Sequence, residues 1–224
     1  MRKVRLCPSI LNADQSNLDC EIDRVAADSD LLHLDVMDGI FVPNTTFTFK
    51  ESVRIIADSP LDVDVHLMIC NPDDEAVNYS KAGATSVTFH LEASKDPHST
   101  ILRIKESGAR ASIAVKPATP LSELEPFLAE LDMVLIMTVE PGFGGQAFMP
   151  NMMGKVAQLR EEIDRLQRDI WLQVDGGISI ETIALAATSG ADAFVAGSAV
   201  YKAESPAQML RELRKLATAT LSLE

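Results

Sequence analysis

Residues 31–43 read LLHLDVMDGIFVP, an apolar run that turns into an alternating pattern. His33, Asp35 and Met37 stand two positions apart, with aliphatic residues between them. Side chains two apart on a β-strand point to the same face. One face of this predicted strand therefore carries an imidazole, a carboxylate and a thioether. A soluble chain rarely directs His and Asp inward unless they are paired with each other, bound to a metal or catalytic.

Short apolar or β-branched runs of this kind recur along the whole chain, at residues 4–6, 31–36, 61–68, 86–90, 111–115, 133–139, 170–174 and 193–196. Between them lie segments whose apolar residues have helical spacing, at residues 17–27, 97–106, 156–166, 180–188 and 207–217. Glycine often follows such a segment, where it can supply the left-handed residue that ends a helix, as at Gly83, Gly108 and Gly190.

Repeated strand–helix units with no linker or low-complexity tract between them predict one α/β architecture. We expect a single (β/α)8 barrel, or TIM barrel, over residues 1–224. An open doubly wound sheet is the alternative, but it usually has fewer strands and carries a GxGxxG motif after the first of them. Here the first strand ends in Cys7-Pro8-Ser9, which favours the barrel.

The charge balance limits the partners that the chain can bind. There are 33 acidic and 20 basic residues, with a net charge of −13. Nucleic acids and anionic membranes need a basic face, so neither is an expected partner. An anionic small substrate needs only a local positive site and remains possible. No apolar run reaches the length of a membrane span.

The cysteines and the first residues predict a cytoplasmic protein. Cys7, Cys20 and Cys70 are widely spaced, odd in number and without a CxxC motif, so we expect reduced thiols. The first residues are basic and then briefly apolar, but Pro8 interrupts the apolar part. We therefore do not expect a signal peptide.

A barrel places its chemistry at the carboxyl ends of the strands and in the loops that follow them. Polar residues and glycines of this chain gather at those positions. They include Ser9, His33, Asp35, His66, His90, Lys116, Glu140, Asp175 and the glycines after the last three strands. This clustering predicts a functional site at one end of the barrel.

Four of these residues, His33, Asp35, His66 and Asp175, can converge on one metal ion. Mixed nitrogen and carboxylate ligands suit Zn²⁺, Fe²⁺, Mn²⁺ or Co²⁺. The alternative is two separate buried His–Asp hydrogen bonds. His90 is interpreted as a core residue or as support for a ligand, and His98 as a surface residue.

The glycine clusters predict a phosphate site. They comprise Gly142, Phe143, Gly144 and Gly145, then Gly176 and Gly177, then Gly197 and Ser198. Glycines let backbone N–H groups approach an anion, and the last loops of a barrel often bind phosphate together with a short helix, here residues 197–201. The alternative is tight turns without a ligand. Met37, Met68 and Met137 would form a soft, dry wall of the same pocket, although core filling is the commoner role of Met.

At this point the chain resembles the ribulose-phosphate 3-epimerase family almost from end to end. The stretches that carry the resemblance are CPSILNAD (7–14), HLDVMDGIFVPN (33–44), DVHLM (64–68), FHLEA (89–93), MTVEPGFGGQ (137–146), VDGGI (174–178) and AGSAVY (196–201). The resemblance implies a barrel of the ribulose-phosphate-binding type, one divalent metal ion per chain, and interconversion of D-ribulose 5-phosphate and D-xylulose 5-phosphate in the pentose phosphate pathway. A homo-oligomer, either a dimer or a hexamer, is also expected.

The resemblance assigns roles by position. His33, Asp35, His66 and Asp175 match the metal ligands, and Asp35 and Asp175 also match the paired acid and base. Ser9 and His66 match substrate contacts, together with the phosphate-side glycine loops. Inversion at C3 through an enediolate needs one group to remove a proton and another to return one to the opposite face, and two flanking carboxylates suit this.

Two departures from the family pattern affect loops: residues 45–50 (TTFTFK) lack a usual Gly, and Ser29 stands where a Gly usually ends the first helix. A close rival is a D-allulose-6-phosphate 3-epimerase. Barrel lyases or decarboxylases are more distant, because they rely on a Lys among their acids in a DxKxxD motif that is not seen after a strand here. A catalytically inert phosphosugar or metal sensor is the alternative from another class.

Overall fold

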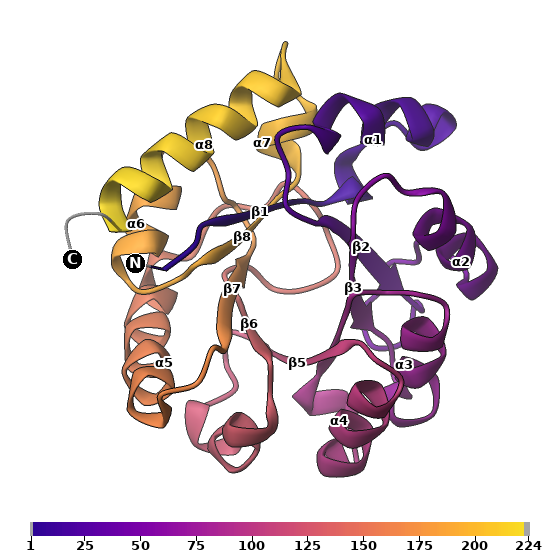
Figure 1. The fold of residues 1–224 in the computed structure, drawn as a ribbon, viewed down its shortest axis with the longest axis vertical. Coiled ribbons are helices and arrows are strands. Elements are labelled where there is room, and N and C mark those ends of the chain that lie inside the picture. The colour runs from indigo at the N-terminus through magenta and orange to yellow at the C-terminus, as the bar shows by residue number, and fades with distance from the viewer. Residues whose placement is uncertain (1, 222–224) are drawn as a thin grey trace.

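The computed structural model describes residues 2–221. Eight parallel strands form one sheet around the centre of the molecule, and helices surround it (Figure 1). The strands are β1 (Arg5–Pro8), β2 (Leu32–Met37), β3 (Val63–Met68), β4 (Ser86–His90), β5 (Arg110–Val115), β6 (Met133–Met137), β7 (Trp171–Asp175) and β8 (Ala193–Ala196). This arrangement confirms the predicted (β/α)8 barrel.

The sheet closes between its first two strands. Its order is β1-β8-β7-β6-β5-β4-β3-β2, so β1 and β2 are the two ends. A parallel bridge pairs Ser9 with His33, and the backbone N–H groups of Asp30 and Leu31 both donate to the Leu6 carbonyl oxygen. Closure therefore places Ser9, just after β1, directly beside His33 near the start of β2.

The helices follow the strands in sequence. They are α1 (Leu18–Ala26), α2 (Phe49–Asp58), α3 (Pro72–Lys81), α4 (Pro97–Glu106), α5 (Met153–Leu166), α6 (Ile183–Thr188), α7 (Ser198–Tyr201) and α8 (Pro206–Leu221). The helical spacing predicted α1, α4, α5, α6 and α8, and residues 197–201 were expected to hold α7. It did not predict α2 or α3. No helix in residues 2–221 is both long and apolar enough to cross a membrane.

The connection between β5 and β6, where the sequence analysis named no helical segment, contains only 3-10 turns, Leu121–Glu123 and Glu125–Glu130, and Pro120 and Pro126 interrupt it. Two predicted strand ranges were too long. The apolar runs at residues 61–68 and 133–139 exceed their strands, which begin at Val63 and end at Met137.

The alternation in β2 separates the two sides of the barrel wall. Leu32, Leu34 and Val36 belong to the main core beneath the helices. His33 and Asp35 are buried on the other side of the wall, with 0% and 2% of their surface exposed. Register with β3 places Asp35 opposite His66, and the same pairing aligns Met37 with Met68. Neighbouring strands thus bring the sequence-predicted residues together inside the barrel.

Side chains cap the adjacent helices at the two places where the sequence departs from the family pattern. Ser29 Oγ donates to the carbonyl oxygen of Val25 at 2.7 Å, which satisfies the end of α1 without a left-handed glycine. In the loop at residues 45–50, Thr48 caps α2, and its partner in a capping box is Glu51. Both departures are therefore accommodated locally.

Candidate metal centre and active site

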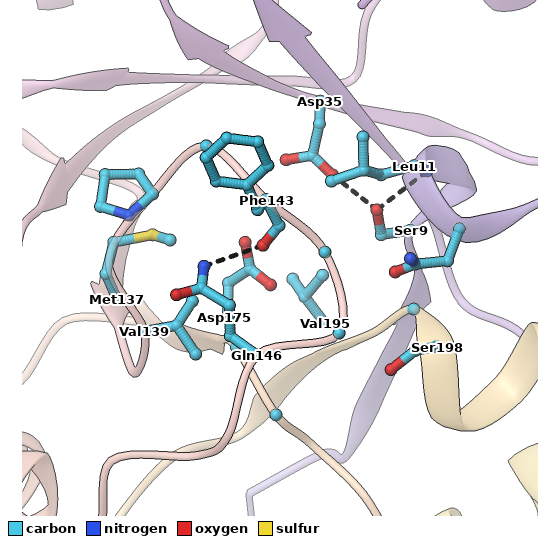
Figure 2. A pocket seen from close by; sticks show the side chains of 18 of the residues that line it. Ser9, Leu11, Asp35, Met137, Val139, Phe143, Gln146, Asp175, Val195 and Ser198 are labelled. Atoms are coloured by element: carbon cyan, nitrogen blue, oxygen red, sulfur yellow. Dashed lines mark hydrogen bonds between the residues drawn. The ribbon is translucent and has the colours of Figure 1, made fainter. Parts of the chain in front are cut away.

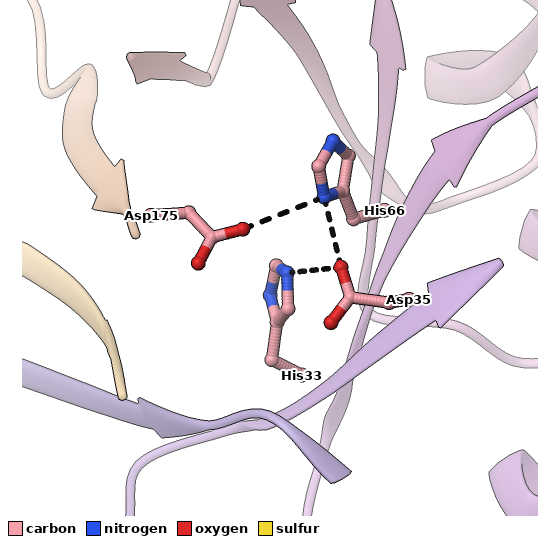
Figure 3. A group of neighbouring side chains, drawn as sticks. All are labelled: His33, Asp35, His66 and Asp175. Atoms are coloured by element: carbon pink, nitrogen blue, oxygen red, sulfur yellow. Dashed lines mark hydrogen bonds and ion pairs between the residues drawn. The ribbon is translucent and has the colours of Figure 1, made fainter. Parts of the chain in front are cut away.

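His33 and Asp35 of β2, His66 of β3 and Asp175 at the carboxyl end of β7 meet inside the barrel (Figure 3). One ligand atom from each lies within 4.8 Å of the others. Asp35 Oδ1 is 3.1 Å from His66 Nδ1 and 3.4 Å from His33 Nε2, while Asp175 Oδ2 is 3.8 Å from His66 Nδ1. The structure thus brings together the four residues that the sequence singled out.

A fifth buried residue, Asp64, fixes the ring of His33. Its Oδ2 lies 2.8 Å from His33 Nδ1 and accepts a hydrogen bond from Gln173 Nε2, while its Oδ1 accepts one from Ser86 Oγ. An acceptor at Nδ1 places the proton on that nitrogen and leaves the Nε2 lone pair directed at the centre. The sequence analysis did not name Asp64, although it lies two residues before His66 and shares its inward face.

His66 is supported from the other side. Its Nε2 lies 3.0 Å from His90 Nε2, and His90 Nδ1 lies 3.2 Å from Glu92 Oε2. His90 is fully buried, in agreement with the interpretation of a core or supporting histidine. His98 lies at the surface of α4, with its side chain 56% exposed beside Glu130, as expected.

The residues present fit a divalent metal ion. Among residues 2–221, the buried Nε2 of His33 has no hydrogen-bond partner, although it faces Asp35 Oδ1. A buried ring nitrogen without a hydrogen-bond partner costs free energy, and coordination of a cation would satisfy it. Two imidazole nitrogens and two carboxylates form a donor set suited to a divalent transition metal or zinc. The cluster could therefore hold one ion.

The two carboxyl groups of the centre have opposite electrostatic surroundings in the metal-free chain. Burial disfavours the charge of Asp35, but His33 and His66 outweigh it and hold the pKa of Asp35 well below its usual range. Burial and the neighbouring Asp35 charge raise the pKa of Asp175 to about 6. Carboxyl groups whose pKa values are pushed apart can take different roles in proton transfer.

A pocket adjoins this centre and shares Asp35 and Asp175 with it (Figure 2). Residues singled out in the sequence make up most of its lining: Ser9, Asp35, Met37, Met68, Met137, Gly142, Phe143, Gly144, Gly145, Asp175, Gly176, Gly177, Gly197 and Ser198. His33 and His66 are not part of that lining and lie in the buried interior. The pocket floor is thus formed by the two carboxylates, and the three methionines are almost fully buried around it.

Ser9 and Asp35 are directly joined in this pocket. Ser9 Oγ donates to Asp35 Oδ2 at 2.5 Å, and the backbone N–H of Leu11 donates to the same hydroxyl oxygen at 3.2 Å (Figure 2). One oxygen of Asp35 is therefore fixed by Ser9, while the other faces the histidines.

The glycine loops that line the pocket have free backbone donors. The backbone N–H groups of Gly145, Gly177 and Gly197 are among those that make no hydrogen bond to any residue in the range 2–221. Such groups can bind an anion without a Lys or Arg side chain. The sequence analysis missed Asn12, whose side chain fills the space beside Gly144 and Gly197, where an added Cβ would lie 2.5 Å and 2.4 Å from it.

Gly177 and Gly145 provide a matched test of the loops. Both have positive φ, +66° and +76°, but a Cβ on Gly177 would lie 2.4 Å from the backbone nitrogen of Phe148, while a Cβ on Gly145 would find its nearest atom at 3.9 Å. We expect Gly177→Ala to destabilise the protein by about 2–4 kcal/mol and Gly145→Ala by about 1 kcal/mol. Denaturant unfolding measures both, and equal effects would contradict this account.

The fold and the cluster define a (β/α)8-barrel protein with a buried histidine–carboxylate centre below a glycine-rich pocket. The model of the ribulose-phosphate 3 epimerase family matches residues 5–201. The chain is 47% identical over 214 residues to the ribulose-phosphate 3-epimerase of Mycobacterium leprae, covering 96% of this chain and 95% of that one. It is 44% identical over 230 residues to ribulose-phosphate 3-epimerase 1 of Cupriavidus necator, covering 98% and 95%. The chain belongs to the ribulose-phosphate 3-epimerase family, which confirms the resemblance and the expectation of an enzyme.

A solved structure adds support for the fold alone. The 3-hexulose-6-phosphate synthase of Salmonella typhimurium superposes with a TM-score of 0.66 at 19% identity, covering 97% of this chain and 100% of that one.

Proposed function

We propose that residues 1–224 act as one catalytic barrel that interconverts D-ribulose 5-phosphate and D-xylulose 5-phosphate by inverting C3. The observation that carries this proposal is the meeting of Asp35 and Asp175, from β2 and β7, at the floor of one pocket in a chain of this family. Epimerisation needs an acid and a base on opposite faces of one carbon, and two carboxylates from distant strands suit that need.

His33, Asp35, His66 and Asp175 are the proposed metal ligands. When bound, a divalent ion such as Zn²⁺, Fe²⁺, Mn²⁺ or Co²⁺ would supply Lewis-acid stabilisation of the negative charge that deprotonation creates on the substrate. Asp64 holds the His33 ring so that its Nε2 faces the centre. The choice among these metals depends on more than the donor set, because all of them accept imidazole and carboxylate.

Asp35 and Asp175 are proposed to exchange the C3 proton, each on its own face of the substrate. Ser9 orients Asp35 through the hydrogen bond to Oδ2, and its hydroxyl lies at the pocket wall where it can also contact the substrate. Met37, Met68 and Met137 exclude water around these carboxylates, which strengthens the electrostatic interactions at the reacting carbon.

The phosphate group is proposed to lie against the last loops of the barrel. The unpaired N–H groups of Gly145, Gly177 and Gly197 support this placement, and they can bind an anion although the described pocket lining contains no Lys or Arg. The lining without lysine also favours an epimerase over the barrel lyases and decarboxylases. The expected homo-oligomer, dimer or hexamer, and the cytoplasmic location stay predictions from the sequence.

Turnover with two phosphosugars tests the proposal. We expect the metal-loaded protein to epimerise D-ribulose 5-phosphate with a kcat/KM at least about 100-fold higher than for D-allulose 6-phosphate, because the pocket must accommodate one more hydroxylated carbon in the hexose. Protein treated with a chelator should be inactive, and its activity should recover when metal is added. Preference for the hexose would establish the rival epimerase, and no turnover of either sugar would favour the inert sensor.

A further inference from the structure

We propose that Glu92 and His90 form a positioning pair that fixes which nitrogen of His66 carries its proton, and that this keeps His66 Nδ1 available to the metal. The inference rests on the metal centre of the proposed function. It concerns two residues that do not line the pocket and are not among the four candidate ligands.

Contacts from the turn after β5 fix the direction of the Glu92 carboxylate. Its Oε1 accepts hydrogen bonds from the backbone N–H of Lys116 at 2.7 Å and from the Thr119 hydroxyl. Its Oε2 is left to face His90 Nδ1 at 3.2 Å. Each oxygen of Glu92 therefore has its own set of partners, and the side chain cannot exchange them freely.

The turn that provides these donors is itself held in place. Lys155, at the start of α5, donates from its ammonium group to the carbonyl oxygens of Pro117 and Thr119, at 2.8 Å and 2.6 Å. Phe41 packs on the ring of His90 with their centroids 4.8 Å apart. These contacts therefore fix the position of Glu92 and the plane of the His90 ring.

The proton order follows from these contacts. An ionised carboxylate can only accept, so His90 Nδ1 must donate to Glu92 and His90 Nε2 must accept. The 3.0 Å contact between the two Nε2 atoms then requires His66 to donate from its Nε2. That order keeps the proton of a neutral His66 ring on Nε2, so that Nδ1, which faces Asp35 and Asp175, can bind a metal in place of a proton.

Replacing Glu92 by Gln should reverse this order without changing the shape of the side chain. The backbone N–H of Lys116 can only donate, so the amide oxygen must stay at the position of Oε1. The amide NH₂ then faces His90 Nδ1 and donates to it. His90 in turn donates from Nε2 to His66 Nε2, and the proton of the neutral His66 ring moves to Nδ1, where it competes with the metal.

Zinc affinity of the full-length protein, measured by chelator competition, tests the pair. We expect Glu92→Gln to bind Zn²⁺ about 10- to 100-fold more weakly than the unmodified chain. Thr119→Val is the matched control, because it removes a hydrogen bond from the same carboxylate without reversing the proton order. It should bind zinc within about threefold of the unmodified chain, and thermal unfolding of the metal-free proteins should show that both variants are folded.

Nitrogen-15 NMR of the histidine rings provides a readout that general destabilisation would not move. In the zinc-loaded unmodified chain, His90 should carry its proton on Nδ1 and His66 on Nε2, and this holds whether or not any variant folds. A proton on His90 Nε2 in that sample would overturn the inference. So would a Glu92→Gln protein with unchanged zinc affinity. If the unmodified chain bound no zinc, cobalt, manganese or iron at all, the metal centre itself would fail, and the pair with it.

Discussion

A His66→Ala protein is expected to keep a folded barrel and to lose most of its divalent metal. His66 Nδ1 lies near both carboxylates of the centre, at 3.1 Å from Asp35 and 3.8 Å from Asp175. Its removal leaves one imidazole and two carboxylates that repel each other. Because loss of a group that merely supports a ligand costs about 10- to 100-fold in affinity, loss of the ligand should cost at least about 100-fold. Elemental analysis of protein purified without chelator measures the effect.

His98→Ala is the matched control for this substitution. His98 lies on the surface of α4, where its side chain is 56% exposed and pairs with Glu130. The change removes an imidazole far from the barrel interior, so metal content and turnover should match those of the unmodified chain. Equal metal content in His66→Ala and His98→Ala would show that the cluster does not bind the ion. The same conclusion would follow if all the proteins were metal-free and the unmodified one remained active.

The centre could be predicted from sequence because two local rules suffice for it. Alternation places His33 and Asp35 on one face of a strand, and the barrel architecture places chemistry at strand ends, where His66 and Asp175 also stand. The same rules could have identified Asp64, which is two residues before His66. They could not identify Glu92, because its role depends on the backbone N–H of Lys116 in a different loop.

The errors in the fold have similarly specific causes. The start of α2 carries a readable capping box, Thr48 with Glu51, but the buried face of that helix is limited to Ser52, Ile55 and Ile56. These three residues nevertheless stand at helical spacing, so the sequence did carry the signal for α2 and the sequence analysis missed it. The Gly144 and Gly197 positions illustrate the opposite case, since their small size accommodates Asn12, from a loop that sequence periodicity cannot place.

Asp35→Asn and Asp175→Asn are each expected to abolish useful epimerisation, with a loss of about 10²- to 10⁴-fold at constant metal occupancy. The two carboxylates come from β2 and β7, and we propose that the substrate is held between them with one face toward each. Each should therefore exchange the C3 proton only on its own face. In D₂O, Asp175→Asn should still allow Asp35 to exchange deuterium into C3 of the epimer whose C–H faces it. Asp35→Asn should show exchange only in the other epimer.

Metal content has to be measured in both variants before these rates are compared, because both residues are also proposed ligands and loss of the ion would deepen the defect. Asn keeps one carbonyl oxygen that can ligate the metal, so excess metal can restore occupancy where the affinity has fallen.

Ser9→Ala is a useful third protein. It removes the hydrogen bond to Asp35 Oδ2 but neither carboxylate, so it should lower the rate without creating a preference for one epimer in the exchange experiment. Epimerisation by either metal-loaded Asn variant at close to the unmodified rate would exclude the two-carboxylate assignment. Exchange into both epimers by one variant would instead assign both proton transfers to the carboxylate that remains.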